Sequence, residues 1–198
     1  MSMIGASEYI KVFVLTFIVN IIPAFMPPTW VVLSLYKIHN EAINTVLLAL
    51  FGALGSTTGR FIMYKYSELF RRFMSKGRLS NLDDLNKVLS KDKKNLFIWT
   101  FIFSLSPIPS NFLFISGGIV KIDPKPLLLG FFSGRFVSYA VMILLSFSIF
   151  NQVELIYDNA KLLFDIIGII GALLIIFIDW DKTIDRLKGI KRYKFKHH

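Results

Sequence analysis

Long uncharged, apolar stretches are the main pattern of this sequence. They run over residues 43–59, 95–120, 126–134, 136–153 and 166–178. An uncharged apolar stretch of about 18 residues or more is typical of a membrane-spanning helix, whereas a core helix of a soluble protein keeps polar residues on its outer face. These stretches lack such a polar face. The pattern therefore predicts an all-α, polytopic membrane protein.

One apolar region, residues 95–121, is interrupted by prolines near its middle. It reads NLFIWTFIFSLS, then PIPSN with Pro107 and Pro109, then FLFISGGIV. The first part has 12 residues, about 18 Å as a helix, which is roughly half of a ~30 Å hydrocarbon core. Because proline removes a backbone donor and breaks a helix, we expect a re-entrant hairpin that enters and leaves the bilayer on one face.

The N-terminal region repeats this arrangement over residues 9–38. VFVLTFIVNII is followed by PAFMPP, which contains Pro23, Pro27 and Pro28, and then by WVVLSLY. We expect a first re-entrant hairpin here. A single kinked span over residues 13–36, with the N-terminus inside, is the alternative interpretation of the same residues.

Basic residues form two clusters that set the topology. Residues 65–94 contain nine Lys and Arg against four acids, and residues 181–198 contain seven against two. The positive-inside rule puts both clusters in the cytoplasm. An even number of crossings must then separate them. Spans at 126–150 and 162–180 supply two crossings, so we expect that residues 95–121 do not cross the bilayer. The alternative, one kinked span over residues 95–120, would place the basic tail outside.

A ten-residue motif, G-x-x-x-G-R-F-x-x-Y, occurs at residues 55–64 and again at 130–139, 75 residues later. Such self-similarity indicates an internal repeat. Each copy lies in a full span, at 42–65 and 126–150, that follows a proline-broken hairpin. Because the two copies then have opposite orientations, we expect an inverted-topology repeat, as in many transporters. The prediction is a single membrane domain over residues 1–198.

The remaining segments are polar and basic. The linker at residues 66–94 carries apolar residues at helical spacing, which predicts an amphipathic helix on the inner membrane surface, with Ser80 and Asp83 as a capping box at its start. The basic tail at 181–198 should also lie on anionic headgroups. We expect a multi-pass protein of the cell membrane with a cytoplasmic linker and C-terminus.

The repeated motif supplies the candidate site. Its glycines have the one-turn spacing that lets two helices approach closely. They are Gly55, Gly59, Gly130 and Gly134. The motif arginines, Arg60 and Arg135, need another explanation, since a charge near the bilayer centre costs at least about 2.5–3.5 kcal/mol. Neither has an acidic neighbour on its own helix face, and a phosphate fits the planar guanidinium fork. We expect both arginines to bind phosphate.

The hairpin tips are candidates for a gate. Broken backbone at membrane depth is tolerated only where it is buried in protein or lines a wet cavity. The tip residues are Asn20, Pro23, Pro27, Pro28, Ser106, Pro107, Pro109, Ser110 and Asn111. The polar ones either satisfy the backbone, bind a headgroup or relay a proton. Tyr64 and Tyr139, one turn after each arginine, either hydrogen-bond across the repeat or mark the interface belt.

Composition argues against several other functions. The chain has no cysteine and three histidines, of which two are terminal and His39 stands alone in a loop. No Ser-His-Asp, metal or phosphate-loop pattern is present, so we predict no cofactor, no metal and no enzymatic activity. Topology already explains the basic charge, so nucleic-acid binding is not predicted.

These features together resemble the DedA family, also called VTT-domain or SNARE-associated membrane proteins. The resemblance rests on PAFMPP, the repeated glycine–arginine motif, the amphipathic linker, and SPIPSNFLFISGG followed by GFFSGR. It covers the chain from about Phe13 to Tyr139. It implies two opposed re-entrant hairpins. The family usually has an acidic residue at the position of Asn20, and arginines at those of Ser104 and Ser110.

The family resemblance also implies a function, which is to move lipids or lipid phosphates across the bilayer. Members are described as scramblases or as proton-dependent translocases of polyprenyl phosphate. We expect a transporter of this kind, with membrane lipids as partners. A small-solute or ion exporter on the same scaffold is an alternative, and so is a non-transporting membrane scaffold whose glycines mediate assembly, for example as a homodimer.

Overall fold

The computed structural model describes residues 5–22, 26–74, 76–106, 110–154 and 160–177, and every contact below is among these residues. Their regular structure is entirely helical, which confirms the all-α prediction. The helices are α1 (Ala6–Ile21), α2 (Thr29–His39), α3 (Thr45–Phe70), α4 (Lys76–Leu89), α5 (Lys93–Leu105), α6 (Asn111–Val120), α7 (Pro124–Glu154) and α8 (Ala160–Phe177), with a short 3-10 helix, η1 (Arg71–Phe73), after α3.

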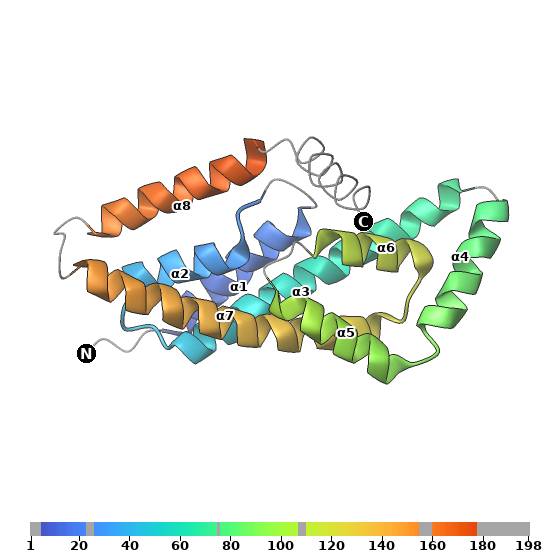
Figure 1. Ribbon diagram of the computed structural model, residues 1–198, viewed down its shortest axis with the longest axis horizontal. Helices are drawn as coiled ribbons and strands as arrows, with labels where there is room; N and C mark the ends of the chain where they lie inside the picture. Colours follow the sequence, from blue (N-terminus) through green and yellow to red (C-terminus); the bar gives the residue numbers. More distant parts are fainter. Residues whose placement is uncertain (1–4, 23–25, 75, 107–109, 155–159, 178–198) are drawn as a thin grey trace, which may run out of the picture.

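Two long helices, α3 and α7, run along the length of the molecule and pack against each other (Figure 1). Thr45–Phe73, which is α3 with η1, and Pro124–Glu154 are both long and apolar enough to cross a membrane. They overlap the predicted spans at 42–65 and 126–150. The third predicted span, 162–180, coincides with α8 as far as Phe177, and its last three residues lie outside the described part of the chain.

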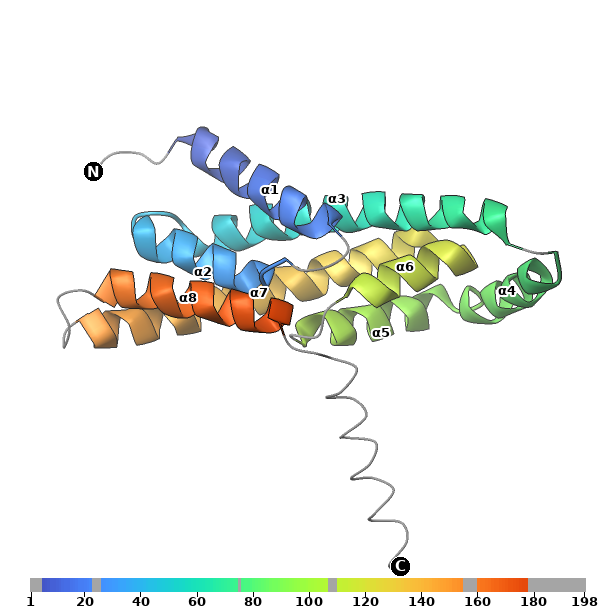
Figure 2. The same ribbon diagram turned by 90° about the horizontal axis from the view of Figure 1, so that it is seen from above.

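Four short helices pack on the two long helices, two short helices beside each half. Figure 2 shows α1 and α2 beside one half of the long helices and α5 and α6 beside the other half. Helix α1 packs mainly on α3, and α5 mainly on α7. The second member of each pair packs on the other long helix, since α2 contacts α7 and α6 contacts α3. Each half of the sequence therefore holds the other half in place.

The helices break where the prolines predict. Ile22 ends α1 and Ser106 ends α5, and both have extended backbone, with ψ of 126° and 153°. Each precedes a proline, and a residue in that position is disfavoured in the helical region. The predicted hairpins at 9–38 and 95–121 are therefore helix pairs, α1–α2 and α5–α6. Their re-entrant placement in a bilayer stays a prediction.

The motif glycines lie where the short helices touch the long ones. A Cβ atom on Gly55 would lie 2.2 Å from Thr16 Oγ1 and 2.4 Å from the Phe13 carbonyl oxygen, and one on Gly130 would lie 2.5 Å from the Phe97 carbonyl oxygen. Real Cβ atoms do not approach other atoms this closely. The backbones of α1 and α5 therefore contact α3 and α7 directly, and only glycine fits between them.

The contact partners of the glycines are themselves repeated in sequence. The second glycines, Gly59 and Gly134, face residues Asn20 and Ser104 at the ends of α1 and α5. The segments TFIVN at 16–20 and TFIFS at 100–104 thus take equivalent positions, 84 residues apart. The repeated hairpins were predicted from the prolines, but this residue correspondence was not, because its offset differs from that of the glycine motif.

The linker differs from the prediction in two ways. Helix α3 continues past the expected end of its span to Phe70, and α4 occupies only part of the predicted linker at 66–94. The predicted capping box is wrong, because α4 begins at Lys76 and Ser80 therefore lies inside it. Asp83 accepts a hydrogen bond from Arg71 instead. The residue that caps a helix here is Asp92, which accepts from the backbone N–H of Asn95 at 3.0 Å at the start of α5.

Apolar side chains are exposed on α7, and several polar side chains are buried beside the apolar core clusters. Helix α7 exposes a broad set of apolar side chains: Leu129, Val137, Val141, Leu144, Leu145 and Ile149. Buried polar side chains lie between the helices instead: Thr16, Asn20, Ser56, Arg60, Thr100, Ser104 and Arg135. This distribution is typical of helices that pack in lipid.

We predict that alanine at Gly55 or Gly130 destabilises the protein by about 1–3 kcal/mol each, because the added methyl group must displace backbone of α1 or α5. Gly77 in α4 is the matched control, since no atom lies within 4 Å of a Cβ placed there. The melting temperature of the detergent-solubilised protein measures the effect. Melting of Gly55→Ala at the temperature of Gly77→Ala would contradict the close contact.

A second prediction concerns the end of α6. Lys121 has a φ of 62° and ends α6 in a Schellman motif, with Ile122 N–H donating to the Gly117 carbonyl at 3.0 Å. A left-handed backbone costs a side-chain-bearing residue roughly 1–2 kcal/mol. Lys121→Gly should therefore raise the free energy of unfolding by up to about 1 kcal/mol. Lys121→Val should lower it in the same denaturation assay, and the opposite order would contradict the assignment.

Candidate functional site

Each motif arginine lies beside the C-terminal end of a short helix. The arginine directly follows the second glycine, and that glycine contacts the last turn of α1 or α5. Arg60 Nη1 donates to the backbone carbonyl of Asn20 at 3.3 Å. Arg135 Nη1 donates to the carbonyl of Ser106 at 3.3 Å. The last carbonyls of a helix have no partner within the helix and carry its negative dipole end, so each arginine caps a broken helix.

Both arginines are buried, with 8% of each residue exposed. The guanidinium of Arg135 lies over the rings of Phe131 and Tyr139, at 5.4 and 5.9 Å from their centroids, in cation–π contact. Both motif arginines therefore lie in the interior of the molecule.

Arg60 keeps unused hydrogen-bonding capacity. Its Nε is buried without a hydrogen-bond partner among the described residues. None of the ion pairs in that part of the chain includes Arg60. A guanidinium has five N–H donors, and a buried charge without a counter-ion is costly. The side chain is therefore set up to accept an anion.

A chain of polar contacts connects the surroundings of the two arginines. The Asn20 side-chain amide donates to the Thr16 carbonyl at 2.8 Å, to Thr29 Oγ1 at 2.9 Å and to Ser56 Oγ at 3.1 Å. Ser56 Oγ is in turn 3.1 Å from the Tyr139 hydroxyl. We call Arg60, Asn20, Ser56, Tyr139 and Arg135 the arginine network. It joins α1, α3 and α7, and through Thr29 it also holds the start of α2.

Among the described residues, the contacts of Ser104 and Tyr64 in the other copy of the repeat differ from those of Asn20 and Tyr139. Ser104 takes the place of Asn20, and its Oγ is buried without a partner among the described residues. Phe131 takes the place of Ser56, so Tyr64 has no hydroxyl to meet and donates to the Ile122 carbonyl at 2.8 Å. Both motif tyrosines are buried and bond outside their own helix, as one of the two alternatives from sequence proposed. Asn20 is thus the centre of a one-sided network.

The structure places the predicted tip residues as follows. Ser106 Oγ donates to the Phe103 carbonyl at 2.7 Å and so closes the end of α5. Ser110 is buried just before α6, and Asn111 is the first residue of that helix. Pro28 precedes α2, and Pro27 lies one residue before it. Pro23, Pro107 and Pro109 lie outside the described residues, so the predicted gate stays a prediction.

Two polar contacts at the α2–α8 end of the molecule were not predicted from sequence. His39, expected to stand alone in a loop, is the last residue of α2 and has its Nε2 3.3 Å from Asp165 Oδ2 in α8. Lys161 in α8 is 3.2 Å from the Glu41 carboxylate. These pairs fasten α8 to the end of α2. Their partners are too far apart in sequence for any local pattern to indicate them.

Comparison of the chain with protein-family models, with curated proteins and with solved structures found no match. The function must therefore be inferred from the site itself. Within the described residues no group of three or more His, Cys, Asp or Glu side chains is placed to hold a metal ion. The site instead combines two buried guanidinium groups with neutral amide and hydroxyl groups, which is chemistry for binding an anion.

We predict that Ser56→Ala and Tyr139→Phe each lower stability by about 0.5–1.5 kcal/mol, because each leaves a buried partner without its hydrogen bond. Since both remove the same contact, the double variant should lose less than the sum of the two. Ser116→Ala is the matched control, because the Ser116 hydroxyl is exposed and bonds only within α6. Denaturant unfolding in detergent measures all four, and strict additivity would contradict the shared bond.

Proposed function

We propose that this protein is an integral membrane transporter of lipids or lipid phosphates, of the DedA type that its motifs resemble. In this proposal α1–α2 and α5–α6 are opposed re-entrant hairpins, and the two halves form an inverted-topology repeat. The observation that carries the proposal is the pair of buried repeat arginines, each at the end of a short helix that stops inside the molecule.

The lengths of the short helices support re-entrant hairpins. Helices α1, α2, α5 and α6 have 16, 11, 13 and 10 residues. At 1.5 Å per residue they are between about 15 and 24 Å long, short of the ~30 Å hydrocarbon core. Figure 2 shows the two pairs extending from opposite ends of the long helices toward the middle. Such pairs would enter the bilayer from opposite faces.

The arginines support a phosphate as the bound group. A buried guanidinium at the end of a broken helix needs counter-charge. Arg60 Nη1 contacts the Asn20 carbonyl and Met63 Sδ, while Arg60 Nε has no partner among the described residues. A phosphate on a lipid supplies that charge while its tail stays in hydrocarbon. Half-helix ends that bind substrate near the bilayer midplane are common in transporters built from inverted repeats.

The identity of Asn20 favours passive transfer over proton-coupled transfer. Its amide nitrogen donates to oxygen atoms of Thr16, Thr29 and Ser56. An amide does not titrate, so this position supplies a fixed donor and not a proton carrier. We therefore favour scramblase activity, in which the lipid gradient alone sets the direction.

One observation favours a second candidate, a non-transporting membrane scaffold. The two arginines cap helix ends, and that structural role alone explains their burial. The two candidates differ in what they require of the side chain. Capping needs one N–H donor, which lysine also has, whereas a bidentate grip on phosphate needs the guanidinium fork.

We predict that Arg60→Lys and Arg135→Lys insert and fold but transfer lipid at least tenfold more slowly than the wild type. The assay uses liposomes that hold the purified protein and carry a fluorescent phospholipid or a polyprenyl phosphate in one leaflet. Lys91→Ala, in the exposed linker, is the control and should transfer normally. Transfer at the wild-type rate by both lysine variants would show that the arginines act only as helix caps. No transfer by the wild type would favour the non-transporting scaffold.

A further inference from the structure

A groove lies along the last turns of α3, away from the arginine network. Its volume is about 560 Å³. Its lining includes apolar and aromatic side chains, namely Phe61, Ile62, Tyr66 and Leu69. It also includes charged side chains, namely Lys65, Glu68, Arg71, Arg72 and Lys121. We call it the α3 groove.

The groove begins with two apolar residues and becomes basic toward the end of the helix. Phe61, Lys65 and Arg72 recur at intervals of four and seven residues, which puts them on one face of α3 and its continuation η1. Phe61 and Ile62 come first along α3, and the cations Lys65, Arg71 and Arg72 follow, with Tyr66 and Leu69 between them. In the orientation proposed above, Phe61 and Ile62 are level with hydrocarbon and the cations are level with the cytoplasmic headgroups.

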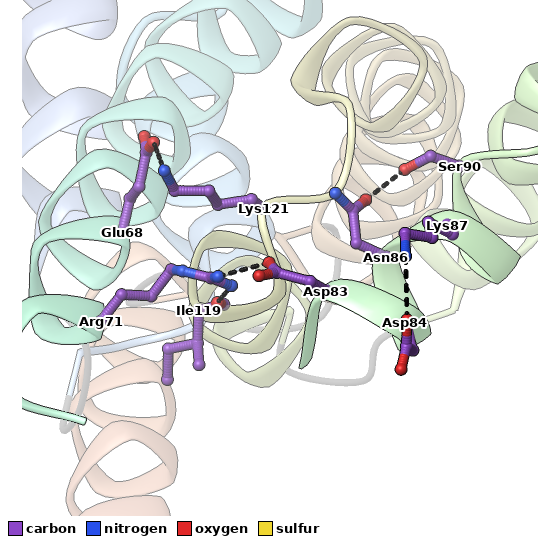
Figure 3. Close-up of polar contacts among 9 residues, drawn as sticks. All are labelled: Glu68, Arg71, Asp83, Asp84, Asn86, Lys87, Ser90, Ile119 and Lys121. Carbon is purple, nitrogen blue, oxygen red and sulfur yellow. Dashed lines mark hydrogen bonds and ion pairs between the residues drawn. The ribbon is translucent and has the colours of Figure 1, made fainter. Parts of the chain in front are cut away.

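The charges in the groove have an excess of cations. Glu68 pairs with Lys121 at 3.5 Å (Figure 3). It also pairs with Lys65 at 3.0 Å, so one carboxylate holds two lysines at the groove. Each lysine has three N–H donors and is about half exposed, with 54% and 49% of the side chain accessible. Arg72 is exposed in η1 and adds a third positive charge.

Arg71 shows how the groove is joined to the rest of the fold. Its guanidinium donates to the Ile119 carbonyl at the end of α6, at 2.8 Å, and to Asp83 in α4, as Figure 3 shows. The groove wall is built from α3, η1 and Lys121, the residue directly after α6, and Arg71 connects it to the linker helix. A ligand across Lys65 and Lys121 would bridge α3 and the end of the α5–α6 pair.

We propose that the α3 groove binds an anionic phospholipid of the cytoplasmic leaflet. The headgroup phosphate lies among Lys65, Arg72 and Lys121, and one acyl chain lies along Phe61 and Ile62. Basic pockets on the cytoplasmic side of membrane helices bind anionic headgroups in this way. The inference rests on the membrane orientation proposed above but not on transport, and this lipid is a resident ligand, distinct from the one moved past the arginines.

Native mass spectrometry of the full-length protein in detergent tests this proposal, with phosphatidylglycerol and phosphatidylcholine titrated separately. The wild type should bind phosphatidylglycerol with at least tenfold lower Kd than phosphatidylcholine. A triple variant, Lys65→Gln with Arg72→Gln and Lys121→Asn, should lose that preference. The control triple, Lys87→Gln with Lys91→Gln and Lys94→Gln, removes the same charge from the linker and should keep it.

Three results would overturn the proposal. Wild-type binding by the groove triple would show that the lipid binds elsewhere. An equal loss in the control triple would indicate diffuse attraction to the basic linker. Displacement of phosphatidylglycerol by an equal concentration of inorganic phosphate would indicate a soluble anion. Arg72→Gln alone, at an exposed position, gives a second measurement if the triple fails to fold, and should weaken phosphatidylglycerol binding at least threefold.

The test separates this inference from the proposed function. The groove triple should transfer lipid at the wild-type rate in liposomes, because Lys65, Arg72 and Lys121 lie outside the arginine network. Normal transfer in liposomes together with no preference for phosphatidylglycerol would contradict only the proposal that the α3 groove binds lipid. A preference for phosphatidylglycerol together with no transfer would contradict only the proposal that the protein is a transporter.

Discussion

The direct backbone contact between the glycines of each long helix and a short helix is the constraint on which the structure depends. Gly55 and Gly130 leave no room for a Cβ atom, so α1 and α5 lie against α3 and α7 at van der Waals distance. This contact fixes how far each short helix can advance along its long helix. Because arginine follows the second glycine of the motif, the same contact sets the guanidinium beside the end of the short helix.

This placement explains why a charge is retained in an apolar region. A helix that ends within a bilayer leaves carbonyl groups that water cannot reach, and the arginine supplies a donor and a positive charge there. The cap also leaves donors unused on Arg60, so structure and function share one side chain. In the proposed transporter, the groups that stabilise the broken helices are therefore the groups that receive the phosphate.

The sequence predicted the parts of this fold that depend on local chemistry. Prolines located the helix breaks, since the residues before Pro23 and Pro107 are extended, and glycine spacing indicated the close contacts. The arginine network was not predictable, because Asn20, Ser56 and Tyr139 meet only once the register between three helices is known. The role of the arginines as helix caps was not predicted for the same reason. The predicted capping box at Ser80 was wrong because α4 begins before the first apolar residue of its helical pattern.

The central claim is that both helix pairs are re-entrant and enter from opposite faces, and cysteine labelling in intact cells tests it most directly. The chain has no cysteine of its own. Single cysteines at Ser7, Glu41, Lys91 and Lys125 flank the two pairs, and all four positions are exposed. A membrane-impermeant maleimide should label Ser7→Cys and Glu41→Cys from outside, and Lys91→Cys and Lys125→Cys only after permeabilisation. Labelling of Lys91→Cys and Lys125→Cys from opposite sides would show that α5–α6 crosses, which would contradict the account.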